Sequence, residues 1–368
     1  MTERSVGGRV VTTAGIVDGY VELSGARITA ITPSADQAGG PWVVPGFVDL
    51  HNHGGGGHTF TTGDPDSALG AARFHLGHGT TTMLASLVSS PYELMREATA
   101  ALTPLVREGV LAGLHYEGPY LAEARCGAQN RDHLRDPSTG ELRALLELGA
   151  GAVRMVTLAP ERPGALAAIK DLVAAGVVAA VGHTDATYEQ TLAAVAAGAT
   201  VGTHLFNGMR PPHHREPGPV VALLGAPGVV CELVADGVHL HDGVLSFAAS
   251  VAGPDRAALV TDAMAAAGMA DGEYELGGQA VAVADGVARL ARNGSIAGST
   301  LTMDAALREA VGAGIPLVDA CRMAATTPAR VLGRAGQLGA LAPGLRADLV
   351  LLDGDLRVQR VMRGGFWM

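Results

Sequence analysis

The feature that constrains the fold most is a regular alternation of short apolar runs and helix-like stretches through the middle of the chain. Eight runs have the length and apolar character of buried strands, at 43–53, 80–87, 110–117, 153–159, 177–183, 199–206, 229–235 and 258–262. Stretches with helical spacing and glycine ends lie between them, at 65–77, 93–109, 140–149, 165–176 and 188–198. Eight strand–helix units predict an α/β fold, a (β/α)8 TIM-like barrel. An open doubly wound sheet is the alternative, but no GxGxxG motif follows the first run.

The two ends of the chain have a different pattern from this middle part. Residues 1–42 hold short β-type runs separated by Gly, Asp and Ser, and the tail returns to the same pattern. We therefore expect a small β-sandwich domain built from 1–44 and 341–368, beside a barrel that spans 45–340. A β-like insertion at 272–292 interrupts the barrel region. A chain of 368 residues is long enough for one large and one small domain.

Charge and cysteine content argue against several classes of function. The formal net charge of −10 argues against a nucleic-acid-binding protein. No apolar stretch is long enough to cross a bilayer and the first residues lack a signal-peptide core, so we expect no membrane partner. The three widely spaced cysteines favour a reducing, cytoplasmic setting over a disulfide framework. Lys170 is the only lysine, so a mechanism that needs a lysine in the site is nearly excluded.

Polar side chains stand where the predicted strands end, which is where a barrel carries its active site. His51 and His53 end the first run at a spacing of two, which turns both rings to one side of a strand. Four more metal-compatible groups stand at or near the ends of later runs: Glu117, His183, His204 and Asp262. A single buried histidine is more often a core residue, but six such groups at one end of a barrel predict a shared site.

The residue types at these positions point to a particular chemistry. Imidazole and carboxylate groups are ligands that suit Zn²⁺ or Fe²⁺. Such an ion lowers the pKa of water towards neutrality and can polarise a carbonyl group. An aspartate beside that water can accept its proton and pass it to a leaving amine. The residues therefore predict a divalent metal cofactor, one or two ions per subunit, and metal-assisted hydrolysis of an amide-like bond.

Eight short motifs together resemble the amidohydrolase superfamily, and within it the deacetylases of N-acetylglucosamine 6-phosphate. The motifs are PGFVDLHNHG, HYEGPYL with the following GAQN, VGHTDA, THLFNGM, REPG, ADGVH, LVTDAM and IAGSTLTM. The resemblance covers almost the whole chain and implies a barrel of the amidohydrolase type. Many amidohydrolases bridge their metals with a carboxylated lysine, whereas these deacetylases use a glutamate on the third strand, which agrees with the lysine shortage here.

The resemblance also implies roles for individual residues. The matched positions are Glu117, His183 and His204 for the principal metal, His51 and His53 for a second metal that some members bind, and Asp262 for the catalytic acid and base. Positions that match substrate contacts are Ala128, Gln129, Asn207, Gly208, Arg215, Asp236, His239, Ile296, Ala297 and Gly298. Arg215 matches an arginine that reaches the partner subunit's site, so the resemblance implies a homodimer that binds an amino-sugar phosphate. Gln129 departs from the family, which usually has a histidine there, and this change could alter the preferred sugar.

We therefore expect the chain to hydrolyse the acetamide of N-acetylglucosamine 6-phosphate to glucosamine 6-phosphate and acetate, in amino-sugar catabolism or cell-wall recycling. One alternative is a related amidohydrolase acting on N-acetylgalactosamine 6-phosphate or on a cyclic amide, and a cyclic amide would not need Arg215. Another alternative, of a different class, is a metal-free homologue that serves as an assembly or regulatory subunit. The complete set of ligand residues argues against this last reading.

Overall fold

The computed structural model describes residues 5–368, and its largest element is an eight-stranded parallel sheet. The strands follow one another in chain order: β5 (Phe47–Asp49), β8 (Thr80–Val88), β9 (Gly113–Glu117), β10 (Val153–Leu158), β11 (Val178–Val181), β12 (Val201–Gly202), β13 (Val230–Val234) and β14 (Ala257–Val260). Each hydrogen-bonded pair of neighbours is parallel, which confirms the predicted barrel. A doubly wound sheet would reverse its strand order, and the order within residues 5–368 does not reverse.

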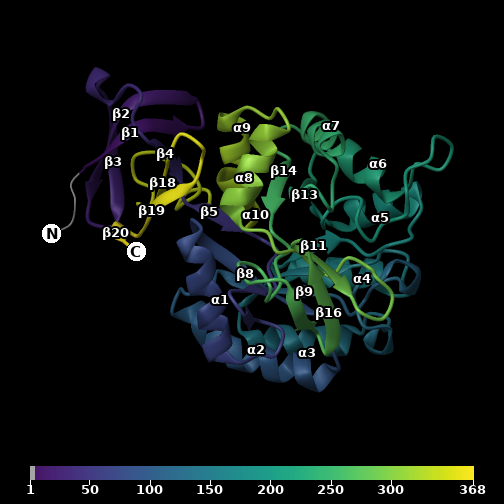
Figure 1. Cartoon of the computed structure of the whole chain (residues 1–368). Helices are drawn as coiled ribbons and strands as arrows, with labels where there is room; N and C mark the ends of the chain where they lie inside the picture. The colour runs from purple at the N-terminus through teal and green to yellow at the C-terminus, as the bar shows by residue number, and fades with distance from the viewer. Residues whose placement is uncertain (1–4) are drawn as a thin grey trace.

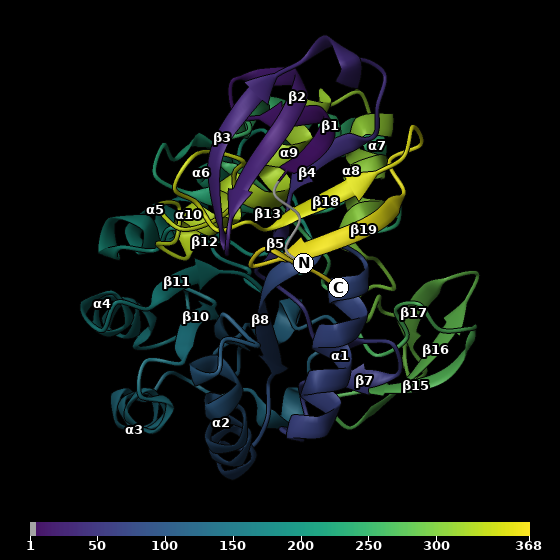
Figure 2. The ribbon, with the colours of Figure 1, turned by 90° about the vertical axis from the view of Figure 1, so that its left-hand side faces the viewer.

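Helices surround the barrel sheet on its outer side (Figures 1 and 2). They are α1 (Pro65–Gly77), α2 (Tyr92–Arg107), α3 (Thr139–Gly149), α4 (Ala165–Ala174), α5 (Tyr188–Ala197), α6 (Gly218–Gly225), α7 (Asp242–Ala252), α8 (Met303–Gly312), α9 (Leu317–Cys321) and α10 (Thr327–Val331), with a π-helical turn at Arg322–Thr326. α1 has the predicted bounds because Asp64 accepts the N–H groups of Asp66 and Ser67 at its start. α5 begins with a capping box between Thr187 and Gln190.

The two end strands of the barrel, β5 and β14, are joined just beyond their carboxyl ends. The N–H of Asp262 donates to the carbonyl oxygen of His51 at 2.9 Å, and the N–H of His53 donates to that of Ala263 at 2.7 Å. On the other side, the N–H of Ser86 donates to the carbonyl oxygen of Asn52 at 2.8 Å. The seam that closes the barrel therefore consists of the segments that carry three of the predicted site residues.

Both ends of the chain pair into one curved seven-stranded sheet beside the barrel (Figure 2). In spatial order the strands are β20 (Phe366–Trp367), β19 (Val358–Arg363), β18 (Leu349–Leu352), β4 (Trp42–Pro45), β1 (Ser5–Thr12), β2 (Gly15–Ser24) and β3 (Arg27–Pro33). The join is the antiparallel pair of β18 and β4, in which Val350 faces Val44. Its own apolar core includes Val10, Val21 and Leu349. This confirms that the two ends of the chain form one small domain.

The prediction that 43–53 is one strand is wrong. Val43 and Val44 belong to β4 in the small sheet, whereas β5 belongs to the barrel, and Gly46 separates the two. A side chain at Gly46 would lie 2.4 Å from the hydroxyl of Thr81, so the chain crosses between the sheets at a position that only glycine fits. The small sheet thus takes residues up to Pro45, and His51 and His53 lie beyond the end of β5.

The insertion after β14 is a three-stranded antiparallel sheet of β15 (Gly272–Leu276), β16 (Gln279–Ala284) and β17 (Val287–Leu290). Its apolar side packs on Val88 and Met264 at the carboxyl end of the barrel. The remaining short elements are η1 (Ala35–Gln37), η2 (Glu123–Arg125), η3 (Arg131–His133), β6 (Gly54–Gly55) and β7 (His58–Thr59). Within residues 5–368, no helix combines the length and the apolar character needed to cross a membrane.

Candidate active site

Three of the predicted ligands meet at the carboxyl ends of β9, β11 and β12. The carboxylate Oε1 of Glu117 lies 2.9 Å from Nε2 of His183 and 2.8 Å from Nε2 of His204. The two Nε2 atoms are 3.2 Å apart. All three side chains are buried, and their reactive atoms face one point. We call Glu117, His183 and His204 the principal group.

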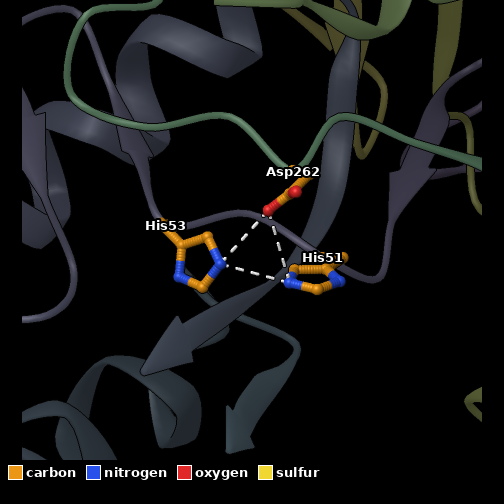
Figure 3. A group of neighbouring side chains, drawn as sticks. All are labelled: His51, His53 and Asp262. Carbon is orange, nitrogen blue, oxygen red and sulfur yellow. Dashed lines mark hydrogen bonds and ion pairs between the residues drawn. The ribbon is translucent and has the colours of Figure 1, made fainter. Parts of the chain in front are cut away.

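His51, His53 and Asp262 form a second group beside the first (Figure 3). The Nε2 atoms of the two histidines are 3.1 Å apart, and Oδ1 of Asp262 lies 3.5 Å from that of His51 and 3.3 Å from that of His53. Glu117 joins the two groups, because its Oε1 lies 3.5 Å from Nε2 of His51 and its Oε2 lies 3.2 Å from Nε2 of His53. The structure therefore brings together the five predicted metal ligands and the predicted catalytic Asp262.

Three of these residues adopt a backbone conformation that side chains rarely take. The φ angles of His183, His204 and Asp262 are +46°, +25° and +49°. Such left-handed residues are unfavourable outside glycine, and they cluster where the surrounding structure imposes them. Here each residue follows a barrel strand, and the turn directs its side chain toward the centre of the barrel mouth.

The far ring nitrogens of the histidines show that the near ones are available to a metal. Nδ1 of His51 faces Glu232 Oε2 at 3.2 Å, that of His53 faces the Ser86 carbonyl at 3.1 Å, and that of His183 faces the Arg125 carbonyl at 2.9 Å. Because these oxygens only accept, each Nδ1 carries the proton and each Nε2 has a free lone pair in the neutral ring. This donor set of imidazoles and carboxylates fits a divalent ion such as Zn²⁺ or Fe²⁺.

The two carboxylates of the site attract protons onto the histidines as they attract a cation, so protons and a metal ion compete for the Nε2 atoms. Burial opposes charge on His53, but its hydrogen bonds to Asp262 and Glu117 raise its pKa to about 9. Burial also opposes charge on Glu117, yet the positive charges of His51 and His183 hold its pKa well below the usual range. The same balance with His51 and His53 lowers the pKa of Asp262. Two ionised carboxylates in a buried pocket provide the surroundings that a cation requires.

A neutral histidine lies directly under the two groups. His115 is two residues before Glu117 on β9, and its ring contacts that of His51 edge-on with a centroid distance of 4.7 Å. Its ring nitrogens lie 2.9 Å from the hydroxyl of Ser86 and 2.8 Å from that of Thr157. Burial and the positive charge of His51 hold the pKa of His115 well below its usual range. His115 therefore supports the site as a neutral hydrogen-bonding group.

Sequence reasoning missed two buried carboxylates that support the site. Glu232 on β13 receives the backbone N–H of His204 at 3.2 Å in addition to Nδ1 of His51. Asp49 accepts from the hydroxyl of Thr261 at 2.6 Å and from the Asn52 amide at 3.0 Å, which ties β5 to β14. Burial raises the pKa of Asp49. Both residues could have been found from the sequence, because each is a carboxylate inside a run that was predicted to be a buried apolar strand.

A cavity of about 280 Å³ opens above the two groups. It is lined by His53, Glu117, Gly127, Ala128, Gln129, His183, His204, Asn207, Gly208, His239, Asp262, Leu276, Ser295, Ile296 and Gly298. Most of the predicted substrate positions are in this set. Leu276 comes from the insertion sheet and, like Gly127 and Ser295, was not predicted.

Three predicted substrate residues do not line the cavity. Asp236 lies behind His239, with its Oδ2 2.7 Å from Nδ1 of that ring, and Ala297 is fully buried behind its neighbours. Arg215 is exposed on the loop between β12 and α6, where its guanidinium lies 2.7 Å from the ring of His214. Figure 1 shows a loop projecting away from the barrel next to α6. The arginine therefore does not contact the cavity of its own chain.

Comparisons with known proteins agree with this geometry. A sequence model described as the amidohydrolase family matches residues 42–368. A Lysinibacillus sphaericus protein named N-acetylglucosamine-6-phosphate deacetylase is 35% identical, over 95% of this chain and 91% of its own. An Escherichia coli O157:H7 protein named N-acetylgalactosamine-6-phosphate deacetylase is 38% identical, over 96% of both chains.

A solved structure is more similar still. It is a Mycobacterium smegmatis N-acetyl-D-glucosamine-6-phosphate deacetylase, determined as a point mutant in complex with N-acetyl-D-glucosamine-6-phosphate. It is 48% identical to this chain, with a TM-score of 0.95, and the match covers 98% of this chain and 97% of that one. The likeness therefore extends through both the barrel and the small domain.

Proposed function

Because the chain belongs to the amidohydrolase family and resembles its amino-sugar-phosphate deacetylases over almost its full length, we propose that it hydrolyses N-acetylglucosamine 6-phosphate. The products are glucosamine 6-phosphate and acetate. The observation that carries this proposal is the convergence of the principal group, Asp262 and His239 on the floor of one cavity. That arrangement places ligands for a cation, a proton acceptor and a hydrogen-bond donor within reach of a single small amide.

The residues that would hold a divalent ion are the principal group, with His51 and His53 available for a second ion. When bound, an ion such as Zn²⁺ or Fe²⁺ polarises the amide carbonyl and makes water more acidic. Glu117 contacts the histidines of both groups, so the orientation of its carboxylate decides which oxygen is available to each group. The Nδ1 contacts of His51, His53 and His183 hold their rings in the orientation that presents Nε2.

Asp262 carries the proton transfers. Its lowered pKa keeps it ionised at neutral pH, so it can accept a proton from the attacking water. It then delivers this proton to the amide nitrogen as the C–N bond breaks. Oδ1 of Asp262 faces His51 and His53, and its Oδ2 faces His239, so the carboxylate lies between the metal-site histidines and the oxyanion donor.

His239 stabilises the negative charge that develops on the carbonyl oxygen. Burial opposes charge on this ring, but Asp236 at 2.7 Å raises the pKa of His239. Asp236 also fixes the orientation of the ring by accepting from its Nδ1. Nε2, which lies 3.8 Å from Asp262 Oδ2, is then the donor toward the cavity.

The phosphate would bind at the rim of the cavity near Asn207 and Gly208, with Arg215 supplied by a second subunit. Arg215 does not line the cavity of its own chain, which supports action across a homodimer. The neighbouring helices support a dimer as well, because Val221 on α6 and Phe247 and Val251 on α7 are 42%, 57% and 45% exposed. α6 and α7 contact each other, and exposed apolar side chains on neighbouring helices fit a subunit interface.

N-acetylgalactosamine 6-phosphate is the second candidate substrate. The relative from E. coli O157:H7 carries that name at 38% identity, close to the values for the glucosamine-type relatives. Gln129 also departs from the histidine that the family usually has beside the substrate. We keep glucosamine as the first choice because the structural neighbour at 48% identity carries that name.

All three cysteines of the chain are buried and free, which fits a cytoplasmic enzyme.

The first test is an assay of acetate release from N-acetylglucosamine 6-phosphate, with N-acetylgalactosamine 6-phosphate and unphosphorylated N-acetylglucosamine in parallel. We expect strong preference for the first compound, and metal removal with a chelator should abolish turnover until Zn²⁺ or Fe²⁺ is restored. Preference for the galactosamine compound would leave the proposed mechanism in place and would identify N-acetylgalactosamine 6-phosphate as the substrate. No release from any of the three by the metal-loaded protein would overturn the proposed function.

A further inference from the structure

Both the oxygen and the nitrogen of the Gln129 side-chain amide form hydrogen bonds within the protein. Its amide Nε2 donates to Oε2 of Glu117 at 2.6 Å, and its Oε1 accepts the backbone N–H of Ser89 at 2.8 Å. Its own N–H donates to the carbonyl oxygen of Cys126 at 2.9 Å, and the residue is only 4% exposed. A side chain held at both ends in this way has little freedom to follow a substrate.

The hydrogen bond from Gln129 to Glu117 gives the two oxygens of that carboxylate different partners. Oε1 faces His183 and His204 at 2.9 and 2.8 Å, and Oε2 faces the Gln129 amide and His53. Rotation of the carboxylate would exchange these roles, and the Gln129 amide opposes it because the amide is itself fixed by Ser89. The contact is short and charge-assisted, which places it among the stronger neutral–ion hydrogen bonds.

We propose that Gln129 is a positioning residue of the metal centre, which fixes the carboxylate of Glu117 so that Oε1 is presented to the principal group. This inference rests on the metal-dependent function proposed above, and it replaces the substrate contact that family resemblance implied for Gln129. Outer partners of metal ligands, when removed, usually weaken metal binding by about 10–100-fold. A carboxamide has a fixed donor and no proton to gain or lose, so it suits this task.

The test is metal affinity in the absence of substrate. Metal-free wild type and Gln129→Leu are titrated with Zn²⁺ in competition with a fluorescent chelator, and kcat and KM are measured separately. We expect Gln129→Leu to bind Zn²⁺ about 10–100-fold more weakly, with KM nearly unchanged in excess Zn²⁺. Gln129→His, which keeps a donor at this place, should restore part of the affinity.

The matched control is Gln279→Leu. Gln279 donates to the backbone carbonyl of Ala128, the residue before Gln129, and contacts none of the metal-site side chains in the described part of the chain. This control makes the same chemical change against the same loop, so we expect wild-type Zn²⁺ affinity. If Gln129→Leu does not fold, Gln129→Asn, which draws the amide back from Glu117, carries the same prediction.

Two outcomes would overturn the inference. Wild-type Zn²⁺ affinity together with a raised KM would show that Gln129 contacts the substrate. Equal losses of affinity in Gln129→Leu and Gln279→Leu would show that only the loop as a whole matters. Failure of the proposed function would look different, because it would leave the Zn²⁺ titrations intact while no amide substrate is hydrolysed.

Discussion

Asp262 belongs to the second group of metal-capable side chains, and its replacement tests the proton transfers directly. We expect Asp262→Asn to lower kcat by about 10²–10⁴-fold, because a carboxamide cannot accept the proton of water. The ion held by the principal group should remain bound, since that group does not include this residue. Steady-state kinetics with elemental analysis check both parts. Turnover close to wild type would rule out the role of Asp262.

Gly208 is a glycine that lies directly against the metal-site residue His183. Its φ is +59°, and an added Cβ would lie 2.7 Å from Nδ1 of His183, the atom that faces the Arg125 carbonyl. Gly208→Ala should therefore displace the ring and lower Zn²⁺ affinity, with a further cost of about 1–2 kcal/mol in stability from the left-handed backbone.

The control for this change is Gly228→Ala. A Cβ at Gly228 would meet no atom within 4 Å, so the substitution should leave both the melting temperature and metal binding unchanged. Isothermal titration with Zn²⁺ and thermal unfolding compare the two variants. Wild-type Zn²⁺ affinity in Gly208→Ala would contradict the argument.

At the scale of elements, α1 packs against the glycine run that follows His53. A Cβ at Gly55 would lie 2.6 Å from Nε2 of His75 and 2.6 Å from the ring of Phe74, so the run must lack side chains for the helix to approach. His75 is buried and its Nε2 lies 2.9 Å from the Gly54 carbonyl oxygen. The helix therefore supports the segment that leads into the site.

The buried His75 gives this packing a pH dependence. Burial lowers its pKa to about 4, whereas the unfolded chain has an ordinary value of about 6.5. Between these values the unfolded state binds the extra proton, so stability falls as pH drops from about 6.5 towards 4, by up to about 3 kcal/mol. Urea unfolding of wild type and His75→Gln at pH 7, 5.5 and 4 checks this. The stability difference should move in favour of the variant as pH falls, and parallel curves would contradict it.

The loop between β12 and α6 carries the arginine proposed to recognise the phosphate. We expect Arg215→Ala to raise KM for the phosphorylated substrate by about 10–100-fold, because a charge-assisted hydrogen bond is lost. Activity on the unphosphorylated sugar should not change. Arg292→Ala, on the exposed surface of the insertion, is the matched control. An equal effect on both substrates would exclude phosphate recognition by Arg215.

The assembled dimer offers a further test, because the position of Arg215 predicts that two variants, each impaired at low substrate concentration, rescue each other. In a mixed dimer of Arg215→Ala and Asp262→Asn, one cavity has both wild-type side chains if Arg215 acts across the interface. At a substrate concentration near the wild-type KM, where Arg215→Ala turns over little, random exchange of subunits then raises activity to about a quarter of the wild-type rate. Activity is measured before and after mixing under conditions that allow exchange. No gain, with exchange demonstrated by tagged subunits, would place Arg215 in its own subunit's site or outside both.

Local sequence patterns were enough to predict the barrel and the kinds of side chain at its mouth. Strand and helix periodicities are local properties, so the alternation predicted the order of the barrel strands, six of them with similar bounds, and α1 at its observed bounds. The run at 199–206 contains only the two-residue strand β12 (Val201–Gly202). Parallel strands of one sheet end at the same edge, so side chains at those ends were expected to meet, and Glu117, His183 and Asp262 do line one cavity.

Only the tertiary structure decided how these groups are held. The split of 43–53 between two sheets depends on the pairing of β4 with β18, about three hundred residues away in the chain. The ring orientations depend on Glu232, the Ser86 carbonyl and the Arg125 carbonyl, which no local pattern connects with the histidines. Such contacts join segments that are distant in sequence and form only when the whole barrel closes, so they have no periodic signal to read.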